Sequence, residues 1–228
     1  MKKKLFFLLS TNFLVIILLA QTQKTFCNQS PKDTFYVKIA SQLHLHSGDT
    51  LADIGAGMGY TIVRIAHYMP GVIFYEEDIK KGVLKKFIYE YENKKSCANV
   101  DVNNFRFFVG DKQSTKFPDH FFKKIFIAIS VHEFEFREAM MNDVKRIMQN
   151  DGKLFIVETF YKTPAAKQRH CDRAFMLKPE FFKLMDDTGF ELVNEIPLSD
   201  DINNSENGED KIKYNNIFAS FFEFKIKP

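Results

Sequence analysis

A glycine-rich turn with an acidic residue ahead of it is the feature of this sequence best suited to hold a ligand. Asp53 stands two residues before Gly55, and Gly57 follows in the segment D-I-G-A-G-M-G. The apolar run 50–54 predicts a strand before the turn, and the periodicity of 61–69 predicts a helix after it. Glycines allow positive φ angles and close approach of a ligand to the backbone. The free N–H groups and dipole of the following helix favour an anionic or nucleotide ligand.

Several alternative chemistries lack their motifs. Tyr60 stands where the dinucleotide fingerprint G-x-G-x-x-G needs its last glycine, which argues against a nicotinamide-dependent reductase. The sequence contains no HExxH, Walker loop or nucleophile elbow. The three cysteines, at 27, 97 and 171, form no CxxC pair, so neither a metal site nor a disulfide framework is expected.

More candidate polar residues follow the later apolar runs. Three consecutive carboxylates follow the run 72–75, namely Glu76, Glu77 and Asp78. They are candidates for ligand binding, and the alternative interpretation is a charged strand end that only faces solvent. A carboxylate at such a place suits the two adjacent hydroxyls of a ribose, because it can accept both hydrogen bonds. Neighbouring strand residues point to opposite faces of the sheet, so the sequence does not decide which of these three side chains faces the ligand.

Two further pairs stand after the third and fourth predicted strands. Gly110 and Asp111 follow the run 105–109, and His132 and Glu133 follow the run 124–130. In an open parallel sheet the ligand crevice lies beyond the carboxyl ends of the strands. A histidine there can accept a proton near neutral pH, and a glutamate can orient it or the substrate. The alternative is a polar strand end that only lines a pocket.

These residues need a parallel sheet to bring them together, and the pattern of the chain predicts one. Predicted strands alternate with predicted helices, which indicates right-handed βαβ units in one α/β domain with a doubly wound, mostly parallel, seven-stranded sheet. The last strand is expected to insert antiparallel. The predicted strands are 50–54, 72–75, 105–109, 124–130, 153–158, 190–195 and 217–226; the predicted helices are 34–43, 61–69, 80–95, 138–149 and 179–187; and a turn is predicted at 150–152.

With these elements in place, Leu51–Gly59 resembles the first motif of class I S-adenosylmethionine-dependent methyltransferases, and the likeness extends over most of residues 34–228. The resemblance implies a Rossmann-like fold with S-adenosyl-L-methionine as cofactor. It also implies that Asp53 and the backbone of Gly55, Ala56 and Gly57 cradle the amino-acid end of that cofactor.

The resemblance also ranks the other candidates. The segment from Asp78 to Leu84 is similar to the family's D-x-x-x-x-x-L segment, so Asp78 is the first candidate for the ribose hydroxyls and Glu77 the second. Asp111 matches the position that binds the adenine amino group, although Gly-Asp is also ordinary turn chemistry. His132 resembles the His or Tyr that many small-molecule methyltransferases have after this strand, which makes His132 and Glu133 the catalytic candidates.

The expected function is therefore methyl transfer to a small-molecule or lipid-like acceptor, by in-line displacement at the sulfonium methyl. No Asn-Pro-Pro-Tyr-like segment and no Pro-Cys nucleophile follow the fourth predicted strand, which argues against methylation of nucleic-acid bases. The alternative is an exported, non-catalytic module on the same fold that binds an adenosyl ligand or serves in protein interactions.

The N-terminus predicts export. Lys2–Lys4 precede an apolar stretch, 5–20, that is shorter than the ~20 residues needed to span a bilayer. We expect a signal peptide or membrane anchor at 1–20, a linker at 21–33 and the methyltransferase-like domain at 34–228, with periplasmic or secreted location and membrane association through 5–20 as an option. The chain has 32 Lys and Arg residues, three of them in this leader, and 29 Asp and Glu residues. The body is therefore neutral, and no nucleic-acid partner is expected.

Overall fold

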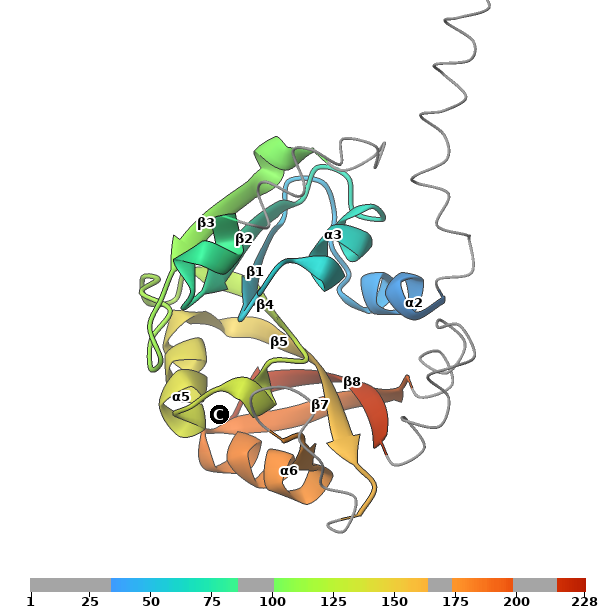
Figure 1. Cartoon of the computed structure of the whole chain (residues 1–228), viewed down its shortest axis with the longest axis vertical. Helices are drawn as coiled ribbons and strands as arrows, with labels where there is room; N and C mark the ends of the chain where they lie inside the picture. The colour runs from blue at the N-terminus through green and yellow to red at the C-terminus, as the bar shows by residue number, and fades with distance from the viewer. Residues whose placement is uncertain (1–33, 86–100, 164–173, 199–216) are drawn as a thin grey trace, which may run out of the picture.

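The computed structural model describes residues 34–85, 101–163, 174–198 and 217–228, and its centre is one mixed sheet (Figure 1). The strand order is β3-β2-β1-β4-β5-β8-β7, with β6 pairing to β5. All pairs are parallel except β5 with β8 and β7 with β8. The strands are β1 (Thr50–Ile54), β2 (Ile73–Asp78), β3 (Phe105–Val109), β4 (Phe122–Ala128), β5 (Met148–Tyr161), β6 (Met176–Leu177), β7 (Phe190–Pro197) and β8 (Ile217–Ile226).

The doubly wound α/β fold and the antiparallel insertion of the last strand are thus confirmed, with two corrections. The sheet has eight strands instead of seven, because the two residues of β6 pair with Phe160 and Tyr161. So short a strand has no periodicity to detect. The turn predicted at 150–152 is also wrong, since β5 begins at Met148, directly after a helix. Its first residues form a bulge opposite β4, where Phe122 faces Met148 and Lys124 faces Lys153.

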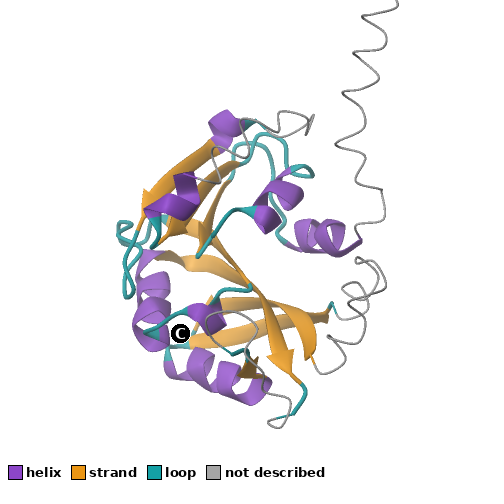
Figure 2. Ribbon diagram, viewed as in Figure 1, coloured by secondary structure: helices purple, strands orange, loops and turns teal. Residues whose placement is uncertain are grey.

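Helices cover both faces of the sheet (Figure 2). Helices α2 (Thr34–Gln42) and α3 (Tyr60–Ala66) pack on one face, and α5 (Arg137–Ile147) and α6 (Lys178–Asp187) pack on the other. Two short 3-10 helices are also present: η1 (Val102–Asn104) lies directly before β3, and η2 (Val131–Glu133) follows β4. None of the helices in the described ranges has the length and apolar character needed to cross a bilayer. The predicted leader at 1–20, the linker at 21–33 and most of the helix predicted at 80–95 lie outside the described residues.

Strand alternation divides the core into two clusters. Leu51 packs with α2 and α3, whereas its neighbour Ala52 packs with α5 and α6. Phe155 and Ile156 of β5 divide in the same way and are fully buried. Each such aromatic or aliphatic side chain contributes about 1.5–3 kcal/mol on burial. The two apolar layers therefore hold β1, β4 and β5 rigidly, and with them the loops at the carboxyl ends of these strands.

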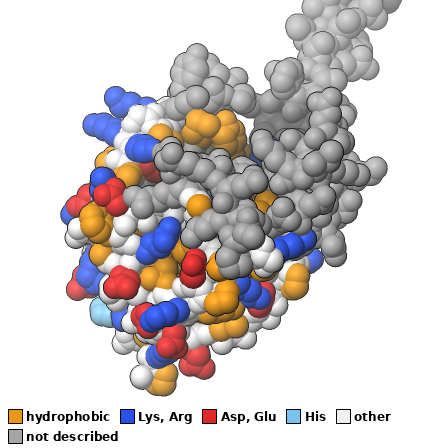
Figure 3. Space-filling view, turned by 60° about the horizontal axis from the view of Figure 1, so that its bottom comes forward, with side chains coloured by type: hydrophobic (Ala, Val, Ile, Leu, Met, Phe, Trp, Pro, Cys, Tyr) orange, Lys and Arg blue, Asp and Glu red, His pale blue; other side chains and the backbone are white. Residues whose placement is uncertain are grey.

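The described surface carries both signs of charge. Figure 3 shows Lys and Arg side chains interspersed with Asp and Glu side chains over the face that is brought forward. Ion pairs between such groups include Lys183 with Asp187 and Lys227 with Asp186. This mixture agrees with the neutral balance of charge in the body of the sequence.

Candidate active site

The glycine turn after β1 has the backbone geometry that its sequence predicts. Gly55, Gly57 and Gly59 have φ angles of 72°, 57° and 68°. The N–H of Ala56 donates to the carbonyl of Glu77 at 2.8 Å, which ties the turn to β2. Positive φ angles strain any residue that carries a Cβ, so three glycines in five positions are a structural requirement here.

The first two glycines meet different surroundings. A Cβ added to Gly55 would lie 2.9 Å from Cβ of Ser130, so this glycine is needed for packing against the end of β4. A Cβ added to Gly57 would have no heavy atom within 4 Å. Gly57 therefore leaves the backbone of the turn open on the side where a cavity lies.

That cavity has a volume of about 460 Å³, within the range that holds small-molecule ligands. It lies at the carboxyl ends of β1, β2 and β4, where an open parallel sheet binds its ligands. Its wall combines the glycine turn, the end of β2, the loop after β3 and the end of β4; the lining residues are Gly55, Gly57, Met58, Glu77, Asp78, Ile79, Lys80, Val83, Lys112, Ser130, Glu133, Phe134, Glu135 and Met140.

Asp78 joins the glycine turn to the end of β2. Its Oδ2 accepts the N–H of Gly57 at 3.0 Å, and its Oδ1 accepts the N–H of Lys80 at 2.7 Å. Each carboxylate oxygen has a second lone pair, so Asp78 can still accept hydrogen bonds from a ligand in the cavity. The structure thus places the first candidate for ribose binding in the cavity wall.

Glu77 also borders the cavity, but it is almost fully buried, with 1% exposure. Burial raises its pKa to about 8, although backbone N–H groups of Gly55 and Gly110 partly offset this effect. At neutral pH the side chain is mostly the neutral acid. A Cβ on Gly110 would lie 2.0 Å from Oε1 of Glu77, so Gly110 is required by the Glu77 side chain.

Asp53 and Glu76 lie on the other side of the turn. They are register partners on β1 and β2 and are 2% and 0% exposed. Burial raises the pKa of Asp53 to about 7, and burial with the nearby Asp53 carboxyl raises the pKa of Glu76 well above its usual range. Neither residue lines the cavity. Oδ1 of Asp53 has no hydrogen-bond partner among the described residues, and the role that the resemblance implies for Asp53, to cradle the cofactor, stays a prediction.

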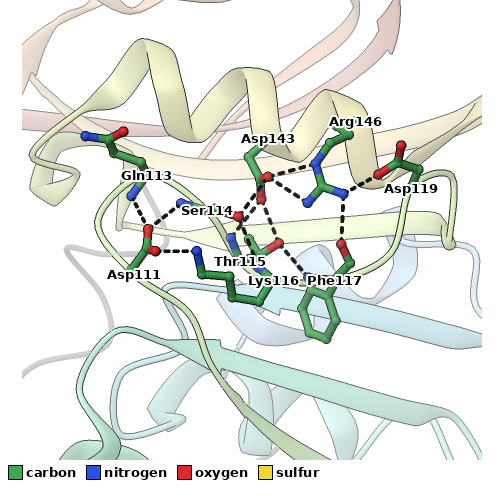
Figure 4. Close-up of polar contacts among 9 residues, drawn as sticks. All are labelled: Asp111, Gln113, Ser114, Thr115, Lys116, Phe117, Asp119, Asp143 and Arg146. Carbon is green, nitrogen blue, oxygen red and sulfur yellow. Dashed lines mark hydrogen bonds and ion pairs between the residues drawn. The ribbon is translucent and has the colours of Figure 1, made fainter.

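Asp111 organises the loop after β3 (Figure 4). Its Oδ1 accepts the N–H groups of Gln113 and Ser114, both at 2.9 Å, and its Oδ2 pairs with Lys116. The hydrogen bond from Lys116 and those from the backbone hold its pKa below the usual range. Asp111 is exposed and does not line the cavity, whereas the next residue, Lys112, does.

Sequence reasoning missed the residue that anchors this loop to α5. Asp143 is 8% exposed and accepts the N–H and the hydroxyl of Thr115, each at 2.7 Å, together with Arg146 (Figure 4). Burial alone would raise the pKa of Asp143, but the bonds from Thr115 and Arg146 outweigh burial and lower it. An aspartate on the apolar face of the predicted helix was the only sign of this contact in the sequence.

The two catalytic candidates occupy different places. Glu133 lines the cavity and its side chain is 45% exposed. His132 is fully buried behind it, with Nδ1 3.0 Å from Oε1 of Glu158. Glu158, itself fully buried, was not singled out in the sequence, although a glutamate inside the run L-F-I-V-E-T-F-Y is unusual for a central strand.

Comparison with known proteins agrees with this geometry. Residues 52–156 match the family described as "Methyltransferase domain". An uncharacterized methyltransferase, YcgJ, from Bacillus subtilis (strain 168) is 29% identical over 109 residues, which span 47% of this chain and 40% of that relative.

Two solved structures show the extent of the common fold. The [4+2]-cyclase SpnF has a TM-score of 0.66 at 13% identity, over 86% of this chain and 81% of its own. A geranyl diphosphate C-methyltransferase from Streptomyces coelicolor A3(2), solved with Mg²⁺, geranyl diphosphate and S-adenosyl-L-homocysteine, has a TM-score of 0.64 at 11% identity, over 86% and 79%. Residues 52–156 are therefore similar to a methyltransferase domain, and the chain shares the overall fold of these solved structures.

Proposed function

We propose that this protein transfers a methyl group from S-adenosyl-L-methionine to a small-molecule or lipid-like acceptor. One observation carries the proposal. Asp78 is hydrogen-bonded to the N–H of Gly57 at 3.0 Å, in the wall of a cavity of about 460 Å³. This contact places a carboxylate that can accept hydrogen bonds from a ribose next to the exposed backbone of the glycine turn, at the carboxyl ends of the parallel strands.

The residues of the cavity suit that cofactor. Asp78 would hold the ribose hydroxyls, and the open backbone at Gly57 would face the amino-acid end. Glu133 adds a carboxyl group to a wall that would face a cationic sulfonium, whereas Glu135 is paired with Lys112 of the same wall at 2.6 Å. The bound cofactor would supply an electrophilic methyl group. The protein's part is to hold the acceptor in line with that methyl, since alignment alone contributes several kcal/mol to such a reaction.

Support for a small acceptor comes from the size of the cavity and from the relatives. The structurally similar C-methyltransferase acts on geranyl diphosphate, an apolar chain with a charged head. SpnF, which has a similar fold, is a [4+2]-cyclase, so the fold by itself does not determine the reaction.

Binding and turnover test the proposal separately. We expect the full-length chain to bind S-adenosyl-L-homocysteine and S-adenosyl-L-methionine in calorimetry, and to transfer labelled methyl groups to small molecules or lipids of an extract. A chain that binds neither compound would refute the proposal. Binding without transfer to any extract fraction would favour the alternative, a non-catalytic adenosyl-binding module.

The predicted leader at 1–20 leads us to propose that the domain acts outside the cytoplasm. A reporter that is active only after export, fused behind Pro228, tests this. We expect activity with the complete chain and none when the leader is deleted. An inactive fusion to the complete chain would place the domain in the cytoplasm.

A further inference from the structure

Three polar side chains run from the cavity into the core behind β4. Glu133 lines the cavity, and its Oε1 lies 3.8 Å from Nε2 of His132. Nδ1 of the same ring lies 3.0 Å from Oε1 of Glu158. His132 and Glu158 are fully buried, so the Glu133 carboxyl is the member of this line that a ligand in the cavity can reach.

Glu158 determines how the ring of His132 is held. Its carboxylate also receives two backbone N–H groups, that of Thr159 at 2.7 Å and that of His132 at 3.2 Å. Both backbone groups donate to the Glu158 carboxylate, which accepts hydrogen bonds and has none to donate. The ring nitrogen Nδ1 of His132 must therefore carry the proton and donate it to Glu158. Nε2 then carries the lone pair and is directed toward Glu133.

The environment of Nε2 is otherwise apolar. No described residue hydrogen-bonds to this buried nitrogen, and the ring of Phe175 packs against the imidazole with 4.7 Å between centroids. Among the described residues, the charged groups nearby are the carboxyls of Glu133 and Glu158 and the guanidinium of Arg137, which binds the carbonyl of His132 at 2.7 Å. The carboxyls of Glu133 and Glu158 thus lie next to opposite nitrogens of the imidazole ring.

We propose that Glu133 is the base that takes the proton of a hydroxyl acceptor, with His132 and Glu158 as positioning residues behind it. This inference rests on the proposed methyl transfer and deepens it by naming the acceptor class. An alcohol or phenol must lose a proton when it is methylated, and a phenol has an ordinary pKa near 10, so a base is needed. A thioether or tertiary amine has no proton to lose and would need no such line of residues.

The acceptor oxygen attacks the sulfonium methyl; the O–C bond forms, and the S–C bond breaks with its electron pair remaining on sulfur. The O–H bond breaks with its electron pair remaining on oxygen, and the proton passes to a carboxylate oxygen of Glu133. His132 can then receive that proton at Nε2 while Glu158 holds the Nδ1 proton in place.

Ring spectroscopy tests the positioning without an acceptor. The histidines of the full-length chain are labelled with ¹⁵N, and the His132 signals are assigned by their loss in His132→Gln. We expect the Nδ1–H tautomer at pH 8. In Glu158→Gln we expect signals of both tautomers, because an amide offers Nδ1 a donor as well as an acceptor. A wild-type ring protonated at Nε2 would overturn the proposal.

Kinetics test the base. Labelled S-adenosyl-L-methionine is supplied with a panel of phenols and aliphatic alcohols, and with a matched panel of tertiary amines and thioethers. We expect transfer to hydroxyl acceptors, a kcat lower by about 10²-fold in Glu133→Gln and by about tenfold in His132→Gln. Affinity for S-adenosyl-L-homocysteine should be unchanged in both variants, because this compound lacks the sulfonium charge that Glu133 would face, and His132 is buried behind the cavity wall.

Glu138→Gln is the matched control, since this exposed carboxylate of α5 lies outside the cavity wall and should keep the wild-type kcat. Glu133→Gln alters an exposed side chain and should fold. It therefore tests the base even if the variants of the buried residues His132 and Glu158 fail to fold. Full kcat in Glu133→Gln, or transfer to the amine and thioether panel alone, would overturn the proposal. Loss of S-adenosyl-L-homocysteine binding by the wild-type chain would refute the proposed function instead.

Discussion

The carboxyl groups of Asp53 and Glu76 lie side by side in neighbouring strands, both buried beneath the glycine turn. They are register partners of β1 and β2, and Oδ1 of Asp53 and both carboxyl oxygens of Glu76 have no hydrogen-bond partner among the described residues. Burial raises the pKa of both carboxyls, and the nearby Asp53 carboxyl raises the pKa of Glu76 further.

This pair predicts a loss of stability as the pH rises. A carboxyl whose pKa is about 7 in the folded state and 3.8 unfolded binds more protons when folded, so the stabilisation present at low pH is lost between these values. We expect the free energy of unfolding to fall by about 2–3 kcal/mol between pH 5 and pH 7. Urea denaturation at each pH measures this. Asp53→Asn, which mimics the protonated form of that carboxyl, should flatten the slope, whereas the exposed control Asp151→Asn should keep it. A wild-type slope of zero would contradict the raised pKa of Asp53.

The two glycines of the turn predict different effects of the same substitution. Gly57→Ala places a methyl in open space but strains the backbone, so we expect a cost of about 1–2 kcal/mol in unfolding free energy. Its methyl would enter the cavity and weaken S-adenosyl-L-homocysteine binding at least tenfold. Gly55→Ala adds an overlap with Ser130 and should cost about 3 kcal/mol or more. Calorimetry and urea denaturation measure both quantities. Equal affinities in Gly57→Ala and the wild type would show that the cofactor does not approach this backbone.

The order of the main elements could be predicted because their signals are local. The strands at 105–109 and 217–226 have the same bounds in the structure as in the sequence prediction. The convergence of Asp78 and the glycine turn also followed, because parallel strands bring their carboxyl ends to one edge of a sheet.

The contacts that depend on distant register could not be predicted. His132 meets Glu158, 26 positions away, and Thr115 meets Asp143, 28 positions away. Neither pair shares a local periodicity. The alternation of Glu76 and Glu77 between two faces was foreseen in principle, but which residue faces the cavity follows only from the observed pairing of β1 with β2.

Asp78 and Asp111 were both candidates for cofactor binding, and the structure predicts unequal effects. Asp78 accepts a backbone N–H on each oxygen, so Asp78→Asn would turn an amide N–H toward another donor at a cost of about 1–3 kcal/mol. We expect S-adenosyl-L-homocysteine affinity to fall about 10- to 100-fold.

Asp111→Asn is the comparison for that variant. Its two backbone N–H bonds go to the same oxygen, which an asparagine retains, so affinity should change less than about threefold. Titration calorimetry of both variants measures the difference. An equal loss in Asp111→Asn would place the adenine on Asp111, as the family resemblance implies.

The bond between Asp143 and Thr115 predicts a strong effect on stability, because it is the buried attachment of the loop 111–119 to α5. Asp143→Asn removes the charge that Arg146 and the Thr115 donors share, and we expect a loss of about 2–4 kcal/mol in unfolding free energy at pH 7. The pKa of Asp143 is lowered in the folded state, so this contribution is present above the unfolded value of 3.8 and is lost as the pH falls below it. The loss of unfolding free energy in the variant should therefore become smaller at low pH, which urea denaturation at pH 7 and pH 3 measures.

Asp119→Asn is the control, because Asp119 binds the same Arg146 from an exposed position and its substitution should cost less than about 1 kcal/mol. Equal losses in the two variants would mean that the arginine pairing, and not the buried bond to Thr115, holds the loop.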